Sequence, residues 1–158
     1  MDDIYFMKKA LRQAQNAAAL GEVPVGAVIV RDGKVVAYGK NARESGKGAT
    51  LHAELTAIQK ACKKLGGWRL IGCTLYVTLE PCIMCAGAIM NSRLERVVIG
   101  ATDPKAGAYG SIMDINTLPV NHKPEVITGV MEKECRRLLS EFFSKLRADK
   151  AFNRKFKV

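Results

Sequence analysis

One histidine and two cysteines lie where the sequence predicts that two helices begin. His52 opens a segment with helical spacing, and Cys82 and Cys85 follow Pro81 at the start of another. Two cysteines three residues apart project from one face of a helical turn, where free backbone N–H groups and the helix dipole favour the thiolate. Two thiolates and an imidazole are zinc ligands, and three protein ligands leave one tetrahedral position open for water. The pattern therefore predicts a catalytic site with one Zn2+ per chain.

Glu54 lies two residues after His52, in the same first turn of the expected helix. Two thiolates neutralise the zinc charge and leave the metal a weaker acid. Such a site needs a carboxylate that takes a proton from water and later passes it to a leaving amine. The pattern H-x-E with P-C-x-x-C is the signature of zinc-dependent nucleobase deaminases. Glu54 is therefore predicted to be the general base.

Each motif taken alone has other interpretations. A lone C-x-x-C occurs in redox proteins and in structural zinc sites, which here would recruit Cys73 or Cys62 as a further ligand. A non-catalytic, zinc-stabilised RNA-binding module would need such a fourth ligand and would leave Glu54 without a role. A zinc-dependent deaminase of a free base or nucleoside, such as guanine or cytosine, is the other alternative. A strongly basic surface would serve no purpose in that enzyme.

Helices and strands alternate along the chain to position these residues. Helical spacing and β-branched runs predict four helices and five strands. The helices are expected at about 3–21, 51–65, 81–90 and from 131 to beyond 147, and the strands at 25–30, 35–38, 74–79, 96–100 and about 126–128. A strand, a helix and a following strand favour a right-handed parallel connection. The predicted fold is α/β, with a mixed five-stranded sheet between layers of helices.

Local signals mark the ends of several elements. Asp3 is the expected N-cap of the first helix and Thr50 that of the second, while Pro81 is expected as the first residue of the third. Asp32-Gly33 is a strong two-residue hairpin signal between the first two strands.

Composition predicts a single domain over residues 1–158. Of these residues, 48% are hydrophobic and 25% charged, as in average globular proteins. The longest apolar run, 23–30, has only eight residues, too few to span a membrane. The acidic start is unlike a secretory signal, and five cysteines are an odd number. We therefore expect a cytoplasmic protein without disulfides, with Cys62 and Cys135 on apolar helix positions in the core.

The positive charge extends along the C-terminal segment, about 131–158. Lys and Arg outnumber Asp and Glu by 25 to 15, giving a net charge of +10. Phosphates attract basic residues, and exposed aromatic rings stack on unpaired bases. At least one of Phe142 and Phe143 is nevertheless expected to close the core. The segment predicts RNA contact because its part from Ser140 to Val158 interleaves six basic residues and four phenylalanines: Lys145, Arg147, Lys150, Arg154, Lys155 and Lys157 with Phe142, Phe143, Phe152 and Phe156.

With the zinc motifs in place, the chain resembles the bacterial tRNA-specific adenosine deaminase (TadA) family of the cytidine deaminase superfamily. The resemblance covers about residues 4–147 and implies the three-layer α-β-α cytidine deaminase-like fold. Residues 54–64 also resemble the related guanine deaminases. The helix that contains them therefore does not distinguish the adenosine deaminase family from the guanine deaminases. Besides the zinc motifs, the resemblance rests on segments 21–27, 68–70, 79–82, 84–88 and 103–107, on Asn41, and on the pairs Asn121-His122 and Phe142-Phe143.

The resemblance implies a role for individual residues. It assigns zinc binding and proton transfer to the same four residues as the motifs do, and implies that Asn41 hydrogen-bonds a flipped-out adenine. It also implies a homodimer that converts the wobble adenosine in a tRNA anticodon stem-loop to inosine. Arg147 belongs to the basic surface described above. The residues implied to line a groove for neighbouring nucleotides, or to lie near it, are Asp103, Lys105, Asn121 and His122.

Two positions depart from the family pattern. Leu51 stands directly before His52, where the family usually has alanine, and Tyr109 stands where a small residue is expected. The larger Leu51 predicts an altered mouth of the pocket. Tyr109 predicts altered substrate contacts from its loop.

Overall fold

Four α-helices and five strands alternate in the computed structural model of the protein, which describes residues 2–156 without the side chains of 152 and 156. A 3-10 helix, η1 (Ile115–Thr117), lies between β4 and β5. The helices are α1 (Asp3–Ala19), α2 (Ala53–Leu65), α3 (Ile83–Asn91) and α4 (Glu132–Phe156). The strands are β1 (Gly26–Arg31), β2 (Lys34–Lys40), β3 (Cys73–Leu79), β4 (Arg96–Ala101) and β5 (Glu125–Thr128).

The strands form one mixed sheet in the order β2-β1-β3-β4-β5. Strand β1 is antiparallel to both of its neighbours, whereas β3, β4 and β5 are parallel to one another. Asp32 and Gly33 join β1 to β2 with positive φ values of 51° and 71°, as a two-residue hairpin turn requires. The mixed five-stranded sheet and its first hairpin were both predicted, and both predictions are confirmed.

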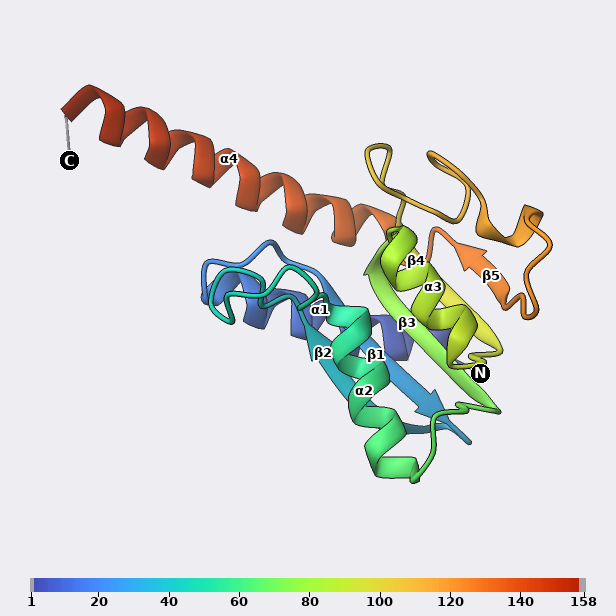
Figure 1. Ribbon diagram of the computed structural model, residues 1–158. Coiled ribbons are helices and arrows are strands. Elements are labelled where there is room, and N and C mark those ends of the chain that lie inside the picture. Colours follow the sequence, from blue (N-terminus) through green and yellow to red (C-terminus); the bar gives the residue numbers. More distant parts are fainter. Residues whose placement is uncertain (1, 157–158) are drawn as a thin grey trace.

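Helices cover the two faces of this sheet. Helices α1 and α4 pack on one face, and α2 and α3 pack on the other (Figure 1). Successive strand residues point to opposite faces, so Val28 lies in the layer under α1 while its neighbour Ile29 lies in the layer under α2. The predicted three-layer α-β-α fold is therefore confirmed.

Two glycines let helices approach the sheet closely. A methyl group at Gly39 in β2 would overlap the carbonyl oxygen of Ala53 in α2. A methyl group at Gly26 in β1 would likewise overlap the carbonyl oxygen of Ala10 in α1. Both helices therefore rest directly on strand backbone, and the first residue of α2 is held against β2.

The start of α1 differs from the prediction by one residue. Asp2, not Asp3, is the N-cap, and its carboxylate accepts a hydrogen bond from the N–H of Tyr5. Asp3 instead accepts two hydrogen bonds of 2.8 Å from the guanidinium of Arg96 and one of 2.9 Å from the hydroxyl of Tyr76. Either aspartate could cap the helix. Asp2 is the cap because Asp3 binds Arg96, which lies 93 residues away in the sequence.

The starts of α2 and α3 also differ from the predictions. His52 is the N-cap of α2, where Thr50 was expected, and Cys82 is the N-cap of α3, so Pro81 lies before the helix. Neither residue makes a side-chain capping hydrogen bond. The side chains of His52 and Cys82 contact each other instead, and this contact between the two helices determines where each helix begins. The predicted stop of α2 at Gly66 is confirmed, with φ at 77°.

Helix α4 runs from Glu132 to Phe156, which agrees with the predicted helix from about 131 to beyond 147, and it projects from the body of the protein (Figure 1). Cys135 is buried at 2% exposure, as expected, while residues 143–151 are all exposed. Cys62 in α2 is half-buried against the core. Across residues 2–156, no helix is both long enough and apolar enough to cross a membrane.

The ion pair between Asp3 and Arg96 ties the start of α1 to β4, and its loss should destabilise the fold. The Arg96 guanidinium holds the pKa of Asp3 below its usual value. We predict that Asp3→Asn lowers the free energy of unfolding at pH 7 by about 1 to 3 kcal/mol in urea titrations. Because the folded-state pKa is lowered, this advantage of the wild type is complete above about pH 4 and disappears as the pH falls through the folded pKa.

The exposed Asp32 provides a control for this prediction. Its carboxylate is 91% exposed and lies 3.8 Å from Arg31. Asp32→Asn should leave the unfolding midpoint nearly unchanged. An equal loss in both variants, or a loss in Asp3→Asn that does not shrink as the pH is lowered below about 4, would contradict the assignment of the effect to the Asp3–Arg96 pair.

Candidate active site

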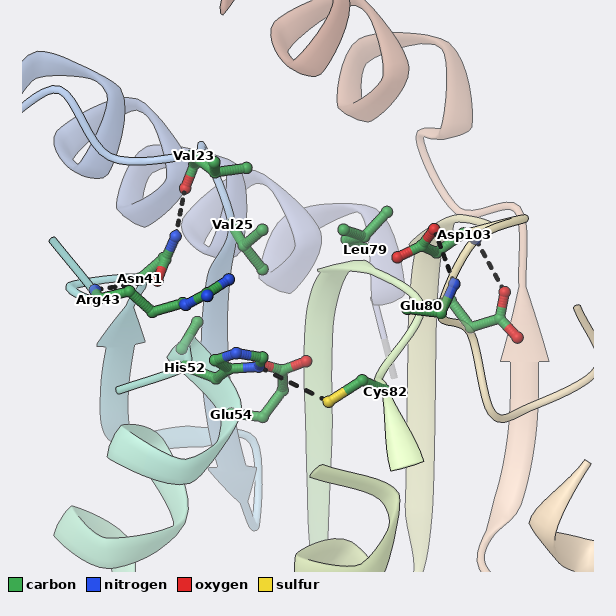
Figure 2. A pocket seen from close by; sticks show the side chains of 12 residues that line it. Val23, Val25, Asn41, Arg43, His52, Glu54, Leu79, Glu80, Cys82 and Asp103 are labelled. Atoms are coloured by element: carbon green, nitrogen blue, oxygen red, sulfur yellow. Dashed lines mark hydrogen bonds between the residues drawn. The ribbon is translucent and has the colours of Figure 1, made fainter. Parts of the chain in front are cut away.

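A pocket of about 200 Å³ opens at the carboxyl end of β3. The start of α2 forms its floor, and Figure 2 shows the segments 23–25 and 41–43 on one side and the end of β3 with Asp103 on the other. The pocket is lined by Val23, Val25, Asn41, Arg43, His52, Ala53, Glu54, Leu79, Glu80, Cys82, Asp103 and Ala106.

His52, Cys82 and Cys85 meet beside this pocket. The Nδ1 atom of His52 lies 3.7 Å from the Sγ atom of Cys82 and 3.5 Å from that of Cys85, and all three atoms lie within 4.8 Å of one another. The N-cap positions of α2 and α3 bring them together from segments 30 residues apart. One imidazole and two sulfur atoms at this spacing could hold a metal ion.

The charges within this group favour a thiolate. A hydrogen bond from the Cys85 thiol, and a second with His52, lower the pKa of Cys82 to about 3. The hydrogen bond between His52 and Cys82 raises the pKa of His52. The hydrogen bond between Cys85 and Cys82, together with burial, raises the pKa of Cys85. Cys82 is therefore an anion at neutral pH, and a bound cation would favour the thiolate form of Cys85 as well.

Glu54 is a buried carboxylate next to these three residues. It lies in the first turn of α2, is 3% exposed, and faces the same space as His52 and Cys82 in Figure 2. Burial raises its pKa to about 7. A carboxylate with a pKa near neutrality can both accept and return a proton at physiological pH, which is the property expected of a general acid-base group.

Asn41 lines the side of the pocket that faces Asp103, and it is 7% exposed. Its side-chain amide already serves the fold: Nδ2 donates a hydrogen bond of 3.2 Å to the carbonyl of Val23, and Oδ1 accepts one of 3.3 Å from the N–H of Arg43. An amide offers two donors and two acceptor positions, so one N–H and one lone pair remain. These remaining groups can still pair with one polar edge of a base.

Asp103 lines the pocket and organises its own loop. Its Oδ1 atom accepts hydrogen bonds from the N–H groups of Lys105 (3.0 Å) and Ala106 (3.3 Å). Lys105 lies next to the pocket, in a groove of about 340 Å³ between this loop and α4, and Arg147 lines the same groove. The structure therefore places two basic residues that the sequence separates by 42 positions along one surface beside the pocket.

Phe143 also lines this groove and is 39% exposed, whereas Phe142 is half-buried. The two rings meet edge to face with their centroids 5.4 Å apart. The side chains of Phe152 and Phe156, and all of Lys157, lie outside the described residues.

Asn121 and His122 lie at the other end of the sheet. A ring nitrogen of His122 hydrogen-bonds the carbonyl of Leu94, just before β4 begins. Because β5 is parallel to β4, the chain must return to the amino end of β4 before Glu125 can start β5. The expectation that Asn121 and His122 lie near the pocket is therefore wrong within one chain.

Neither departure from the family pattern alters the lining of the pocket. The side chain of Leu51 lies against Gly46 and Gly48 in the neighbouring loop. Tyr109 is buried in the core at 7% exposure. The expected effects of these residues on the pocket mouth and on the substrate surface are therefore not found.

Three pocket-side residues were missed in the sequence. Arg43 and Glu80 line the pocket, and Glu22 lies beneath the loop that carries Arg43. Glu80 had a detectable signal, because a single carboxylate stands between an apolar strand and Pro81. Glu22 had a similar signal, because it is the only charged residue in the apolar stretch 17–30. Arg43 stands among other charged and polar residues and had no comparable signal.

The chain is similar to known proteins over most of its length. The family model of MafB19-like deaminases matches residues 1–147. The tRNA-specific adenosine deaminase of Bacillus subtilis (strain 168) is 50% identical over 155 residues, which cover 98% of this chain and 96% of that protein. The chain belongs to the tRNA-specific adenosine deaminase family. It is therefore an enzyme, a hydrolytic deaminase.

Solved structures agree with this family membership. A structure from a study of A-to-I editing by tRNA:A34 deaminases superposes on this deaminase with a TM-score of 0.83 and 45% identity, covering 85% of this chain and 99% of the other. The guanine deaminase of Nitrosomonas europaea superposes with a TM-score of 0.73 and 28% identity, covering 88% and 83%. The tRNA-editing relative is thus more similar than the guanine deaminase.

The three-residue group makes a prediction about metal content. Purified deaminase should carry about one metal ion per chain, and Cys82→Ala should lose most of it after dialysis, because two ligands hold a metal far less tightly than three. Elemental analysis measures this loss. Cys62→Ala is the matched control, since Cys62 is also half-buried but lies outside the group. Full metal retention in Cys82→Ala, or equal loss in both variants, would contradict the assignment.

Proposed function

We propose that this deaminase converts adenosine to inosine at the wobble position of a tRNA anticodon. The observation that carries the proposal is the pocket itself, in which a metal-ligand group and the buried Glu54 lie beside a groove lined by Lys105 and Arg147. The identity of 50% to the tRNA-specific adenosine deaminase of Bacillus subtilis supports the same substrate. An anticodon loop is unpaired, so its bases can leave the stack and enter a pocket.

We propose zinc as the metal and His52, Cys82 and Cys85 as its ligands. Zinc at about 2.3 Å from sulfur and 2.0 to 2.1 Å from nitrogen, in tetrahedral geometry, separates these ligand atoms by about 3.6 Å. The distances of 3.7 Å and 3.5 Å from His52 to the two sulfur atoms fit this value. Bound zinc would supply a Lewis acid that makes water a sufficient nucleophile at neutral pH.

Glu54 would carry the proton in both halves of the reaction. It accepts a proton from the attacking water and passes it to N1 as the water oxygen bonds to C6 of adenine and the C6–N1 double bond becomes single. It then moves the remaining proton of the new hydroxyl group to the amino nitrogen as the bond from C6 to that nitrogen breaks, so that ammonia leaves and inosine, with C6=O and N1–H, remains. A pKa of about 7 for Glu54 suits both transfers. Asn41 would hold the base through its remaining N–H and lone pair.

The neighbouring nucleotides would follow the groove between the Asp103 loop and α4. Lys105 and Arg147 would contact phosphates there, and Asp103 would line the passage to the pocket. Asn121 and His122 remain proposed RNA contacts, on a surface away from the pocket of their own chain.

We further propose that residues 1–158 form one deaminase domain that pairs as a homodimer in the cytoplasm. Helix α3 supports an interface between copies, since it has no charged residue and presents Ile83 at 59% exposure. None of the five cysteines, which all lie within residues 2–156, forms a disulfide, and this fits a reducing compartment.

The alternatives have less support. A structural zinc site needs a fourth protein ligand, and among residues 2–156 only the three form a metal-ligand group, while Cys73 lies at the start of β3, away from the pocket. A deaminase of free bases has the likeness to the guanine deaminase in its favour. That reaction would make no use of the groove beside α4.

The proposed activity predicts substrate selectivity. The deaminase should release ammonia from an anticodon stem-loop with a wobble adenosine, and much less from free guanine, cytosine or adenosine. The Glu54→Gln variant should keep its metal, but its turnover should fall by about 100- to 10,000-fold or more, because an amide cannot accept the proton. Rapid deamination of free guanine with no inosine formed in the stem-loop would establish the free-base enzyme instead. Near-normal turnover by Glu54→Gln would place the general base elsewhere.

The groove predicts a salt-dependent contribution from two cations. Each phosphate contact on a single strand adds about 0.7 to the slope of log affinity against log salt, so replacing Lys105 and Arg147 by alanine should flatten that slope by up to about 1.4. Base selectivity should persist, because phosphate contacts do not read the base. Alanine at the exposed Lys63 and Lys64 of α2 is the control. If only that control pair changes the slope, the RNA lies along α2.

A further inference from the structure

Two buried carboxylates beside the pocket take no part in the chemistry described so far. Glu22 is 1% exposed and Glu80 is 3% exposed, and neither forms an ion pair within residues 2–156. We propose that Glu22 and Glu80 are positioning residues of the active site, each fixing one of the two loops that form opposite walls of the pocket. This inference rests on the proposed function, because it concerns how the substrate of that pocket is held.

Glu22 holds the wall formed by residues 41–48. One carboxylate oxygen accepts the N–H of Ser45 at 2.5 Å, and the other accepts the N–H of Glu44 at 3.2 Å. The adjoining residues Asn41 and Arg43 line the pocket, yet the side chains of residues 43–47 are all exposed. This stretch therefore has no buried side chain of its own, and the Glu22 carboxylate ties it to the body of the protein.

Glu80 holds the facing wall, residues 103–111. One oxygen accepts the N–H of Asp103 at 2.9 Å and also the hydroxyl of Ser111, while the other accepts the N–H groups of Tyr109 at 3.0 Å and Ser111 at 3.1 Å. A methyl group at Gly107 would overlap the carboxylate. The loop thus wraps closely around one buried anion, and Gly107 allows that approach.

A carboxylate fixes a loop more sharply than apolar contact does. Every hydrogen-bond partner found for either carboxylate is a donor: Glu22 accepts two backbone N–H groups, and Glu80 accepts three backbone N–H groups and one hydroxyl. Donors on both oxygens of a carboxyl group favour its charged form. A buried charge loses much of its compensation when one donor moves away, so the loop has one favourable position and few intermediate ones.

The two walls carry groups that would contact the substrate rather than the groups that perform the chemistry. Figure 2 shows Asn41 and Arg43 on one side and Asp103 on the other, while the metal ligands and Glu54 belong to the starts of α2 and α3. Loosening either wall should therefore weaken substrate binding more than it slows the reaction of the bound substrate. The expected signature is a change in KM with little change in kcat.

Glu22→Gln and Glu80→Gln test this inference. Glutamine keeps the shape but turns one acceptor oxygen into an NH2 group that faces a backbone donor. In each variant KM for the stem-loop should rise by about 10- to 100-fold, and metal content should stay at the wild-type value. The kcat should change by less than about threefold. Hydrogen exchange should accelerate at Glu44 and Ser45 in the first variant, and at Asp103, Tyr109 and Ser111 in the second.

Glu95→Gln is the matched control. Its carboxylate also accepts a loop N–H, that of Gly72 at 2.9 Å, but at the other end of the sheet from the pocket. It should leave KM unchanged. If Glu80→Gln does not fold or loses its metal, Ser111→Ala removes one donor to the same carboxylate and should raise KM by a smaller factor. If Glu22→Gln does not fold, the one-carbon-shorter Glu22→Asp replaces it, with the same expected split between KM and kcat.

Several results would overturn the positioning role. Wild-type KM in folded variants, even with faster hydrogen exchange, would make the carboxylates merely structural. An equal rise in KM in the Glu95→Gln control would make the effect unspecific. A wild-type enzyme that acts only on free bases would instead overturn the proposed function. The same KM comparison on the accepted base would then still decide the role of Glu22 and Glu80.

Discussion

The active site depends on the contact between Gly39 in β2 and Ala53 in α2. Ala53 stands between His52, the proposed metal ligand, and Glu54, the proposed general base, and its carbonyl oxygen lies where a methyl group at Gly39 would be. This contact fixes the first turn of α2 against the sheet. With that turn in place, the Nδ1 atom of His52 meets the two sulfur atoms of α3, and Glu54 is buried beside them. A larger side chain at position 39 would displace His52 and Glu54 together.

Local patterns in the sequence were sufficient to predict the helices and strands and the residues that meet beside the pocket. The strands were predictable from β-branched runs, and the hairpin from Asp32-Gly33, because these signals act over a few residues. That His52, Cys82, Cys85 and Glu54 lie together was predictable, because the chemistry proposed for them requires particular residue types at fixed spacing. The comparisons with known proteins then confirmed the family and the fold that the resemblance implied.

Contacts between distant segments account for what the sequence did not reveal. The N-cap of α1 was misassigned because Arg96 binds Asp3, and His52 and Cys82 became N-caps through their contact with each other. The hydrogen bonds of Glu22 and Glu80 reach loops more than 20 residues away. Such partners can be identified only once the sheet has brought the loops together.

The outer part of α4 has a thermodynamic consequence for RNA binding. The outer part of this helix projects from the body of the protein (Figure 1), and residues 143–151 are all exposed, so beyond the groove residues Phe143 and Arg147 the helix has little core to pack against. A helical segment of about 12 to 15 residues is only marginally stable in water without tertiary contacts. An RNA strand lying along it would stabilise the helix as well as neutralise its charge, so part of the binding free energy would be consumed in ordering the protein. The affinity would then vary with the helix propensity of residues that never touch the RNA.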